Sequence, residues 1–495
     1  MHEIIKLAKS NYTFKASLLI FITIISYAFL LNNINLWSDE LYSVLMAKDS
    51  FSDMWELLTT EDSKPPLYYL YLKFILFLFP KKYEIFGAHF ASFLLLVLAQ
   101  IFAFVSVKKD YGDKVALWLI AFIMLLPHSL WLALEVRTYM LSSLLLLMAF
   151  VYGLRLTRTP TTSDFYKFGI VSILALYSHY YCAIFLMFLY LFILIILIKD
   201  KTFNKYGYSF LVTTSIVAIC FLPWIFIPLS NGGNISKFWY VNMDFVKFSW
   251  RFFTNPLQPE IFQSHFFIAT VFSVVTFNFS IVIGVFDFKH FSHKLQRAIF
   301  VGVFSFIATY MLLLAISYIF RPVVTARYLK IFSLTLYFVG AIVVSQIKIL
   351  QKPVIFSLII GFIFTYADIR ATSFDNEYKK AVYDIRKFIS KDTTILTTDN
   401  ANLFCEYYLP EYKCAIIADE YGEILRLKSL KKHLYLYSKE PTNDMFVLSI
   451  FNTASDDCIE YNSTYRFGNA VRLCKINKDL AKHFLTQSLN KRLIK

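Results

Sequence analysis

Long apolar segments recur along the first 370 residues of this 495-residue chain, and they constrain its fold more than any other feature. A helix that crosses a bilayer needs about 20 mostly apolar residues. Eleven segments approach this requirement, and they lie at 17–36, 84–107, 115–133, 138–155, 168–187, 182–198, 208–229, 266–286, 299–320, 328–346 and 353–369. Because lipid offers no hydrogen bonds to a backbone, we predict a polytopic α-helical membrane protein.

The fifth and sixth of these segments overlap within 168–198. This stretch can be read as one long span or as two short spans broken at residues 178–181. We predict two spans, because helix tilt or local thinning of the bilayer accommodates short ones. A single span would place the following lysine cluster, at 199–205, on the opposite side of the membrane from the other lysine clusters.

The lysine and arginine residues predict the orientation of the chain. Every segment expected on the inner side carries two or three of them: Lys6, Lys9, Lys15, Lys108, Lys109, Lys114, Arg155, Arg158, Lys167, Lys199, Lys201, Lys205, Lys289, Lys294, Arg297, Lys348 and Lys352. Such residues favour cytoplasmic loops, so we predict a cytoplasmic N-terminus and a C-terminus outside. The same bias accounts for the formal charge of +15 without a nucleic-acid partner. No small-residue cleavage site precedes the first span, so no cleavable signal is expected.

The composition changes after residue 369, where long apolar runs give way to mixed polarity. Helical periodicity at 377–390 and short apolar runs predict a small α/β domain outside the membrane. Its expected strands lie at 394–398, 414–418, 433–437 and 445–451. We therefore predict a transmembrane domain at 1–369 and a soluble domain outside the membrane at 370–495.

Four of the six cysteines lie in this tail. An even set outside the cytoplasm indicates two disulfides, most simply Cys405–Cys414 and Cys458–Cys474. The other two pairings, and four free thiols, stay open. Together with the short loops, outer disulfides favour the inner membrane of a bacterium over the endoplasmic reticulum.

Polar residues that are unusual near a membrane gather in the segments expected on the outer side. The pair Asp39-Glu40 follows the first span, and ionisable groups at such a depth are costly unless they function. The other residues of this kind are Asp62, Lys64, Tyr69, Glu135, Arg137, His179, Tyr180, Arg321, Arg327 and Tyr328. Carboxylates can act as a base or hold a cation, and arginine and lysine can bind phosphate. The chain contains neither a P-loop nor a GxGxxG motif, which argues against a nucleotide as the bound phosphate compound.

Five short motifs carry a resemblance to a known family. They are WSDE at 37–40, KPPLYYL at 64–70, VRTYML at 136–141, SHYY at 178–181 and ARYL at 326–329. With them the chain resembles the GT-C superfamily of membrane glycosyltransferases. Within it, the chain is similar to family 39, which includes protein O-mannosyltransferases and the lipid A aminoarabinose transferase. The order and spacing match over roughly the first 330 residues. Each motif alone is weak, whereas the set on one membrane face is more specific.

The resemblance implies an inverting enzyme that takes a sugar from a polyprenyl-phosphate donor on the outer face of the membrane. Its acceptor would be a hydroxyl of lipid A, a glycan or a protein. Asp39, with Glu40 beside it, would be the catalytic base. Lys64, Arg137 and Arg327 would hold the donor phosphate. We assign five other outer residues to the substrate pocket: Tyr69, Glu135, His179, Tyr180 and Tyr328.

A divalent metal is an open alternative. The aminoarabinose transferase has a glutamate just before its matching lysine that helps to hold a metal, and this chain has Ser63 there. Glu40, Asp62 and His179 would be the remaining ligands.

Each of these residues also has a structural interpretation. Asp39 and Glu40 can cap the helix that follows them. Glu135 and Arg137 can close a turn as an ion pair. Arg327 can extend to lipid headgroups, and the histidine and tyrosines can anchor the chain at the interface.

Other functions fit a polytopic chain as well. A lipid or glycan transporter or flippase predicts charged residues at span midplanes and internal repeats, whereas these spans are nearly free of charge. A glycan polymerase or ligase usually carries its chemistry in one large outer loop. A non-catalytic scaffold with an outer binding domain is the third alternative.

Overall fold

A computed structural model describes residues 12–31, 34–62, 64–230, 267–319, 323–324, 326–373, 377–391, 394–398, 401–418, 445–449, 458–461 and 471–476. The chain divides into two compact units, and each is described on its own. The helical unit comprises residues 1–32, 64–71 and 86–368, and the mixed unit comprises 33–63, 72–85 and 369–495. Arg321, the loop at 231–266 and the expected strand at 433–437 lie outside the described residues.

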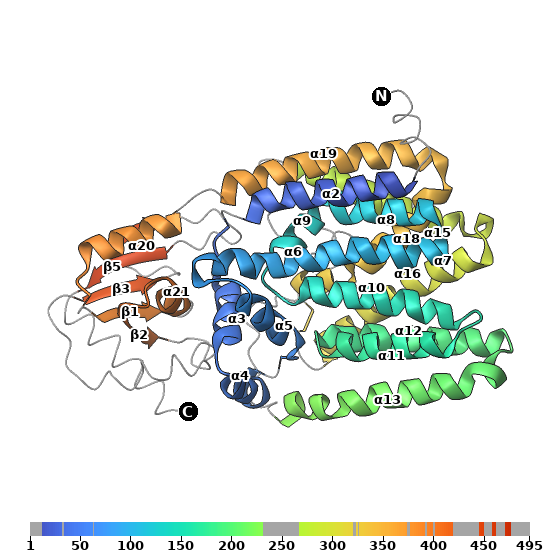
Figure 1. Cartoon of the computed structure of the whole chain (residues 1–495), viewed down its shortest axis with the longest axis horizontal. Coiled ribbons are helices and arrows are strands. Elements are labelled where there is room, and N and C mark those ends of the chain that lie inside the picture. The colour runs from blue at the N-terminus through green and yellow to red at the C-terminus, as the bar shows by residue number, and fades with distance from the viewer. Residues whose placement is uncertain are drawn as a thin grey trace. The chain divides into compact units, whose positions relative to one another are not determined.

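The helical unit is built from long helices that lie alongside one another (Figure 1). Its elements are α2 (Tyr12–Leu31), α6 (Glu84–Phe102), η3 (Ala103–Val107), α7 (Lys108–Tyr111), α8 (Asp113–Leu125), α9 (Pro127–Leu134), α10 (Tyr139–Leu156), α11 (Thr162–Leu176), α12 (Tyr180–Lys199), α13 (Phe203–Ser230), α15 (Phe267–Phe286), η4 (Phe288–His290), α16 (His293–Ile319), α17 (Ala326–Leu329), η5 (Lys330–Phe332), α18 (Ser333–Gln346) and α19 (Lys348–Ser373). The predicted polytopic helical class is confirmed.

Eight of the described helices are long and apolar enough to cross a membrane, and a bent pair brings the number to nine. The sequence led us to expect eleven spans. A helix occupies each expected segment, but α11 has only 15 residues and the apolar part of α15 that is described begins at Val271. The predicted break within 168–198 is confirmed, because α11 ends at Leu176 and α12 begins at Tyr180.

The span expected at 115–133 is bent by 68° between α8 and α9. Leu126 adopts an extended conformation immediately before Pro127, the first residue of α9. A residue before proline is disfavoured in the helical region, and proline suits the first turn of a new helix. The bend therefore follows from the Leu-Pro step. Helix α9 then ends at Leu134, just before the turn that carries Glu135.

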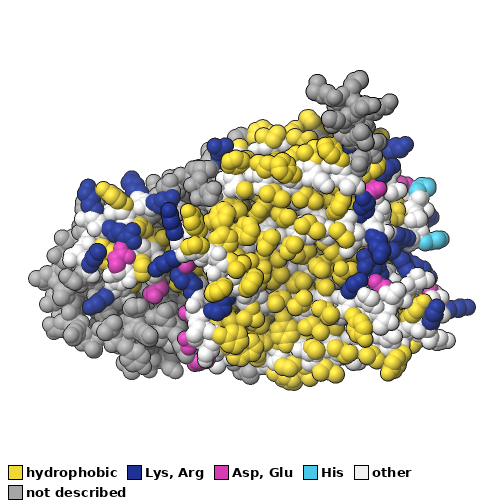
Figure 2. Space-filling model, viewed as in Figure 1, with side chains coloured by type: hydrophobic (Ala, Val, Ile, Leu, Met, Phe, Trp, Pro, Cys, Tyr) yellow, Lys and Arg dark blue, Asp and Glu magenta, His cyan; other side chains and the backbone are white. Residues whose placement is uncertain are grey.

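Burial separates central helices from peripheral ones. In the spans at Tyr139–Leu156 and Arg327–Gln346, 89% and 94% of the apolar window is buried, against 22% in α13. Large apolar side chains therefore cover the outside of the unit, and Figure 2 shows a broad face of them. A soluble protein rarely exposes such a surface, whereas lipid chains favour it.

The mixed unit contains a five-stranded sheet in the order β2-β1-β3-β5-β4. Its first strands, β1 (Thr394–Thr398), β2 (Lys413–Ala418) and β3 (Met445–Ser449), are parallel, and β5 (Val471–Ile476) runs antiparallel to both β3 and β4 (Cys458–Tyr461). Its other elements are α3 (Ser38–Lys48), α4 (Phe51–Leu57), η1 (Leu58–Asp62), η2 (Lys81–Tyr83), α20 (Glu377–Phe388) and α21 (Ala401–Tyr408). Helix α5 (Leu67–Phe77) belongs to both units. The predicted α/β tail is confirmed.

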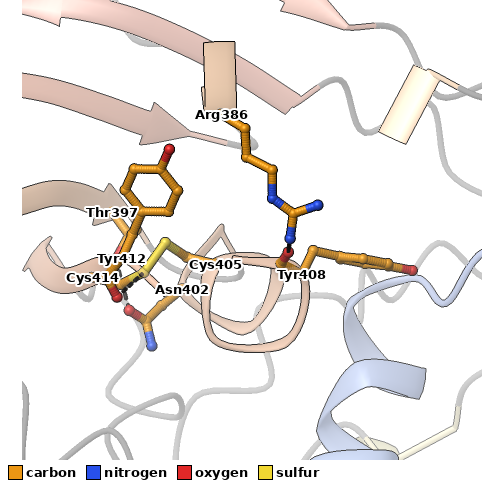
Figure 3. Close-up of a disulfide and its surroundings, with 7 residues drawn as sticks. All are labelled: Arg386, Thr397, Asn402, Cys405, Tyr408, Tyr412 and Cys414. Carbon is orange, nitrogen blue, oxygen red and sulfur yellow. Dashed lines mark hydrogen bonds between the residues drawn. A yellow bond between two sulfur atoms is a disulfide. The ribbon is translucent and has the colours of Figure 1, made fainter. Parts of the chain in front are cut away.

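A disulfide joins Cys405 of α21 to Cys414 of β2, as the sequence predicts. In Figure 3 it lies beside Tyr412, while Arg386 of α20 donates to the carbonyl of Tyr408. The bond thus fixes α21 to the sheet. In the backbone register Cys458 of β4 lies opposite Cys474 of β5. Their side chains lie outside the described residues, so the second pairing stays a prediction.

Helix α21 also packs against α3, the helix that carries the carboxylate pair. The hydroxyl of Tyr408 accepts a hydrogen bond from the backbone N–H of Leu36 at 3.2 Å. The ammonium of Lys48 lies 5.5 Å from the centre of the Tyr407 ring. The C-terminal tail therefore supports the segment that contains Asp39 and Glu40.

Candidate active site

The turn between α9 and α10 carries two of the predicted site residues, Glu135 and Arg137. The N–H of Arg137 donates to the carbonyl of Glu135 at 2.8 Å. Two side chains of α6 hold this turn. Ser92 donates a hydrogen bond to the carbonyl of Glu135, and a ring nitrogen of His89 contacts the carbonyl of Leu134. Sequence reasoning missed both, since a lone serine or histidine in an apolar helix carries little signal.

Glu135 forms a buried ion pair with Lys330. The two side chains are 1% and 3% exposed, and Lys330 Nζ lies 3.1 Å from Glu135 Oε2. The same ammonium lies 5.6 Å from the centre of the Tyr139 ring. Charges removed from water require a partner, so this pair connects the turn after α9 to η5, which directly precedes α18.

A second turn, at 177–179, lies against the first. Thr138 donates its hydroxyl to the carbonyl of Ser178 at 2.8 Å, and Ser142 donates to the hydroxyl of Ser178 at 2.9 Å. His179 begins α12 as its N-cap, with Nδ1 accepting the N–H of Tyr181 at 3.1 Å. These bonds hold the break between α11 and α12 against the turn that carries Arg137.

Four rings form an aromatic cluster at this position: Tyr139, His179, Tyr181 and Tyr328. The ring of His179 lies 5.1 Å from that of Tyr328 and 5.2 Å from that of Tyr181, measured between centroids. Tyr139 lies 6.2 Å from His179 and 6.3 Å from Tyr328. The predicted residues His179 and Tyr328, which are far apart in sequence, are therefore neighbours.

Positively charged side chains lie within electrostatic range of this aromatic cluster. Arg327 and Arg137 are within that range of Tyr139. The segment after Lys64 is held nearby, because the N–H of Leu67 donates to the carbonyl of Tyr177 at 3.0 Å. Burial, reinforced by the positive charges of Arg137 and Lys64, lowers the pKa of His179 to about 3. His179 is consequently a neutral acceptor at physiological pH.

Among the described side chains of the helical unit, four cations, Lys64, Arg137, Arg327 and Lys330, and one carboxylate, that of Glu135, gather here. Such an excess favours an anion, and arginine forks match phosphate oxygens. The same charges oppose a divalent cation at His179. Among the described side chains no three metal-ligating groups come together, and the side chain of Asp62 lies outside them. The other two candidate ligands, Glu40 and Asp62, belong to the mixed unit, so the metal alternative stays a prediction.

Asp39 and Glu40 belong to the mixed unit and are described apart from the cations. Both lie in the first turn of α3. Glu40 is fully buried, and its Oε2 accepts the N–H of Trp37 at 3.2 Å, as a capping glutamate does. Asp39 is only partly buried, and its backbone carbonyl accepts the hydroxyl of Ser43. The two adjacent carboxylates therefore have different surroundings.

Two other predicted residues occupy less central positions. Tyr69 is buried, and its ring lies 6.0 Å from that of Tyr68. Tyr180 accepts a hydrogen bond from Trp224 of α13 at 3.1 Å. Tyr180 thus connects α12 to α13, while Tyr181, which follows it, belongs to the aromatic cluster.

Lys330 is the main residue that sequence reasoning missed. It lies inside an expected span, where one lysine near the end is typical of a side chain that extends to headgroups. The usable signal was its spacing from Arg327, because residues three apart share one face of a helical turn. Tyr139 lay within a motif but carried no assigned role.

Comparison with known proteins adds the fold. No protein-family model and no curated protein matches the sequence. Solved structures do match, among them ArnT from Cupriavidus metallidurans in the apo state, at 10% identity and a TM-score of 0.59, and the same protein bound to undecaprenyl phosphate, at 9% identity and a TM-score of 0.60. Each match covers 92% of this chain and 97% of that one. The chain thus shares the fold of ArnT, in agreement with the resemblance that its motifs indicate.

Proposed function

We propose that this protein is a membrane glycosyltransferase that takes a sugar from a polyprenyl-phosphate donor. The observation that carries the proposal is the meeting of Lys64, Arg137 and Arg327 around one aromatic cluster. Phosphate is the anion that such a set recognises. The shared fold supports the same donor class, because the ArnT structure holds undecaprenyl phosphate.

In this proposal the donor phosphate leaves C1 of the sugar with the electron pair of the bond that breaks. The cations stabilise the negative charge that grows on it, and preorganised charge of this kind is often the largest catalytic contribution. The acceptor hydroxyl attacks C1 from the opposite face and inverts it. Asp39 takes the hydroxyl proton, for which a positioned base contributes roughly 10²–10⁴-fold.

The two carboxylates take different roles here. Glu40 closes the first turn of α3 through Trp37, so we assign it to holding Asp39 in place. Asp39 is the more accessible of the two. The pocket residues Glu135, His179, Tyr328, Tyr69 and Tyr180 would position the sugar or the acceptor.

We place this site on the periplasmic face of a bacterial inner membrane, with the N-terminus in the cytoplasm. Residues 1–369 would be the catalytic domain and 370–495 the periplasmic domain. The lysine and arginine bias supports this orientation, and so does the disulfide Cys405–Cys414, since such bonds persist in oxidising compartments. The acceptor would be a hydroxyl of lipid A, a glycan or a protein, and the sugar a hexose or a pentose.

The test is release of the leaving group. Purified protein in lipid nanodiscs is incubated with a panel of polyprenyl-phosphate hexoses and pentoses plus a lipid A and glycan acceptor mixture, and free polyprenyl phosphate is measured by mass spectrometry. We expect release from at least one donor, with roughly 10²-fold less in Arg137→Gln. The control Lys167→Gln removes an exposed charge from α11 and should behave as the wild type.

The proposal fails if no donor releases polyprenyl phosphate while undecaprenyl phosphate itself does not bind. It also fails if Arg137→Gln, still folded by melting temperature, turns over as fast as the control.

A further inference from the structure

A cavity of about 170 Å³ lies at the other end of the helical unit from the aromatic cluster. Arg137 precedes α10 and Arg158 follows it, and the 18 residues of α10 extend roughly 27 Å. The cavity is lined by Tyr111, Thr157, Arg158, His293, Lys294 and Arg297 among others. It is therefore separate from the proposed active site.

Three cations face this cavity with their positions fixed by neighbours. Arg158 donates to the hydroxyl of Tyr111 at 2.7 Å, and its guanidinium lies 4.9 Å from the centre of that ring. The ammonium of Lys294 also lies 4.9 Å from the Tyr111 ring and donates to the carbonyl of Asp110. Arg297 donates to the carbonyl of Thr157 at 3.1 Å.

The carboxylates around the cavity do not balance these charges. Asp110 pairs with Arg155 at 2.6 Å, and Asp200 pairs with Arg297 at 2.6 Å. Arg158 and Lys294 make no ion pair within the described part of the chain. Two like charges held beside one ring repel each other, and an anion placed between them would remove that cost.

We propose that this cavity binds a phosphate group, that of an anionic phospholipid headgroup. Arg158 uses one of its five N–H donors on Tyr111, which leaves others for phosphate oxygens. Figure 2 shows lysine and arginine side chains gathered at this end of the unit, beyond the broad apolar face that suits lipid chains. Basic pockets between membrane helices commonly take such headgroups. The inference goes beyond the proposed glycosyl transfer and does not depend on it.

Free inorganic phosphate offers the same chemistry, so the test separates the two sources. Full-length protein is transferred from detergent into vesicles of phosphatidylcholine with 20–30% phosphatidylglycerol, or of phosphatidylcholine alone, and retained lipid is measured by native mass spectrometry. A second arm measures the melting temperature in detergent with inorganic phosphate or phosphatidylglycerol. The variants are Arg158→Gln and Lys294→Gln, and the control is Lys289→Gln, an exposed lysine at the same end.

We expect selective retention of phosphatidylglycerol and a stabilising shift with it, both weakened roughly tenfold in affinity by either variant and unchanged in the control. A shift with inorganic phosphate alone that both variants remove would identify the phosphate group itself as the ligand. Equal retention in Lys294→Gln, whose exposed side chain can change without unfolding the protein, would overturn the proposal. So would equal retention of phosphatidylcholine and phosphatidylglycerol by the wild type.

Discussion

The ammonium of Lys330 lies 3.1 Å from Oε2 of Glu135, and both side chains are almost completely buried. The two residues are 195 positions apart in sequence. Their pairing holds the turn after α9 against η5, which follows directly on the helix of Arg327 and Tyr328. Two of the predicted site segments therefore owe their proximity to a contact that involves an unpredicted residue.

Loss of either partner of this ion pair should destabilise the helical unit. Lys330→Met removes the ammonium and leaves the carboxylate of Glu135 buried. In comparable pairs such a change lowers the free energy of unfolding by about 3–5 kcal/mol. Replacing both, in Glu135→Leu/Lys330→Met, removes the desolvation cost as well and should recover most of that loss. The measurement is the melting temperature in detergent of the two single variants and the double variant. Additive losses in the double variant would contradict the coupling, and Lys167→Met serves as the exposed control.

Substitution of the two adjacent carboxylates of α3 should have different effects on transfer. Asp39→Asn should lower transfer by roughly 10²–10⁴-fold, because it removes the proposed base, and leave the melting temperature close to that of the wild type. Glu40→Gln should keep most of the transfer activity and lower the free energy of unfolding by about 1 kcal/mol, since a glutamine retains an oxygen that accepts the N–H of Trp37. Transfer by both variants is measured as release of polyprenyl phosphate, and stability as the melting temperature. Full activity in Asp39→Asn would remove Asp39 from the mechanism.

The helices were predictable because membrane spans follow from a local property, the length of an apolar run. The bend at Pro127 was not expected, although the Leu-Pro step contains its cause. The assembly of the mixed unit could not be read from sequence either. Residues 33–63 pack with the C-terminal tail through contacts such as Leu36 with Tyr408, and such pairing at long range leaves no periodic signal.

The site was partly predictable for a similar reason. Glu135, Arg137, His179 and Tyr328 stood out as polar or charged groups in short turns between apolar spans, and the structure brings them together around the aromatic cluster. Lys330 carried no prediction, because its buried partner Glu135 lies 195 positions away in the sequence. The catalytic roles of Asp39 and of the cations remain predictions.

Lysine should not fully replace Arg137 in function. Its side chain is 8% exposed, and a guanidinium can donate to two phosphate oxygens at once, whereas an ammonium acts as a point charge. We expect Arg137→Lys to weaken transfer roughly tenfold and Arg137→Gln roughly a hundredfold. The measurements are the initial rate at saturating donor and, separately, the KM for the donor. Equal rates for arginine and lysine at this position would show that charge alone suffices.

The pH dependence of stability should reveal His179. Its folded pKa is lowered to about 3 by burial and by Arg137 and Lys64, whereas the unfolded value is about 6.5. Between these values the unfolded chain binds more protons, so the free energy of unfolding falls as the pH drops from about 6.5 towards 3. His179→Asn keeps an oxygen that can accept the N–H of Tyr181 but does not titrate. The melting temperature should therefore fall less steeply from pH 7 to 5 in the variant, and parallel curves would refute the assignment.

A second disulfide should join Cys458 to Cys474. The register of β4 and β5 places these residues directly opposite each other, and opposite residues of antiparallel strands bring their Cβ atoms about 4.5–5.5 Å apart, near the separation that a disulfide needs. Protein from an oxidising compartment, digested without reduction, should yield one peptide pair containing Cys405 and Cys414 and another containing Cys458 and Cys474. Loss of the second pair in Cys458→Ser should lower the free energy of unfolding of the mixed unit by about 2–4 kcal/mol, while Cys220→Ser, a change at an exposed free cysteine of α13, should leave it unchanged. Free thiols at both positions in the wild type would refute the pairing and would remove one argument for an oxidising location of the tail.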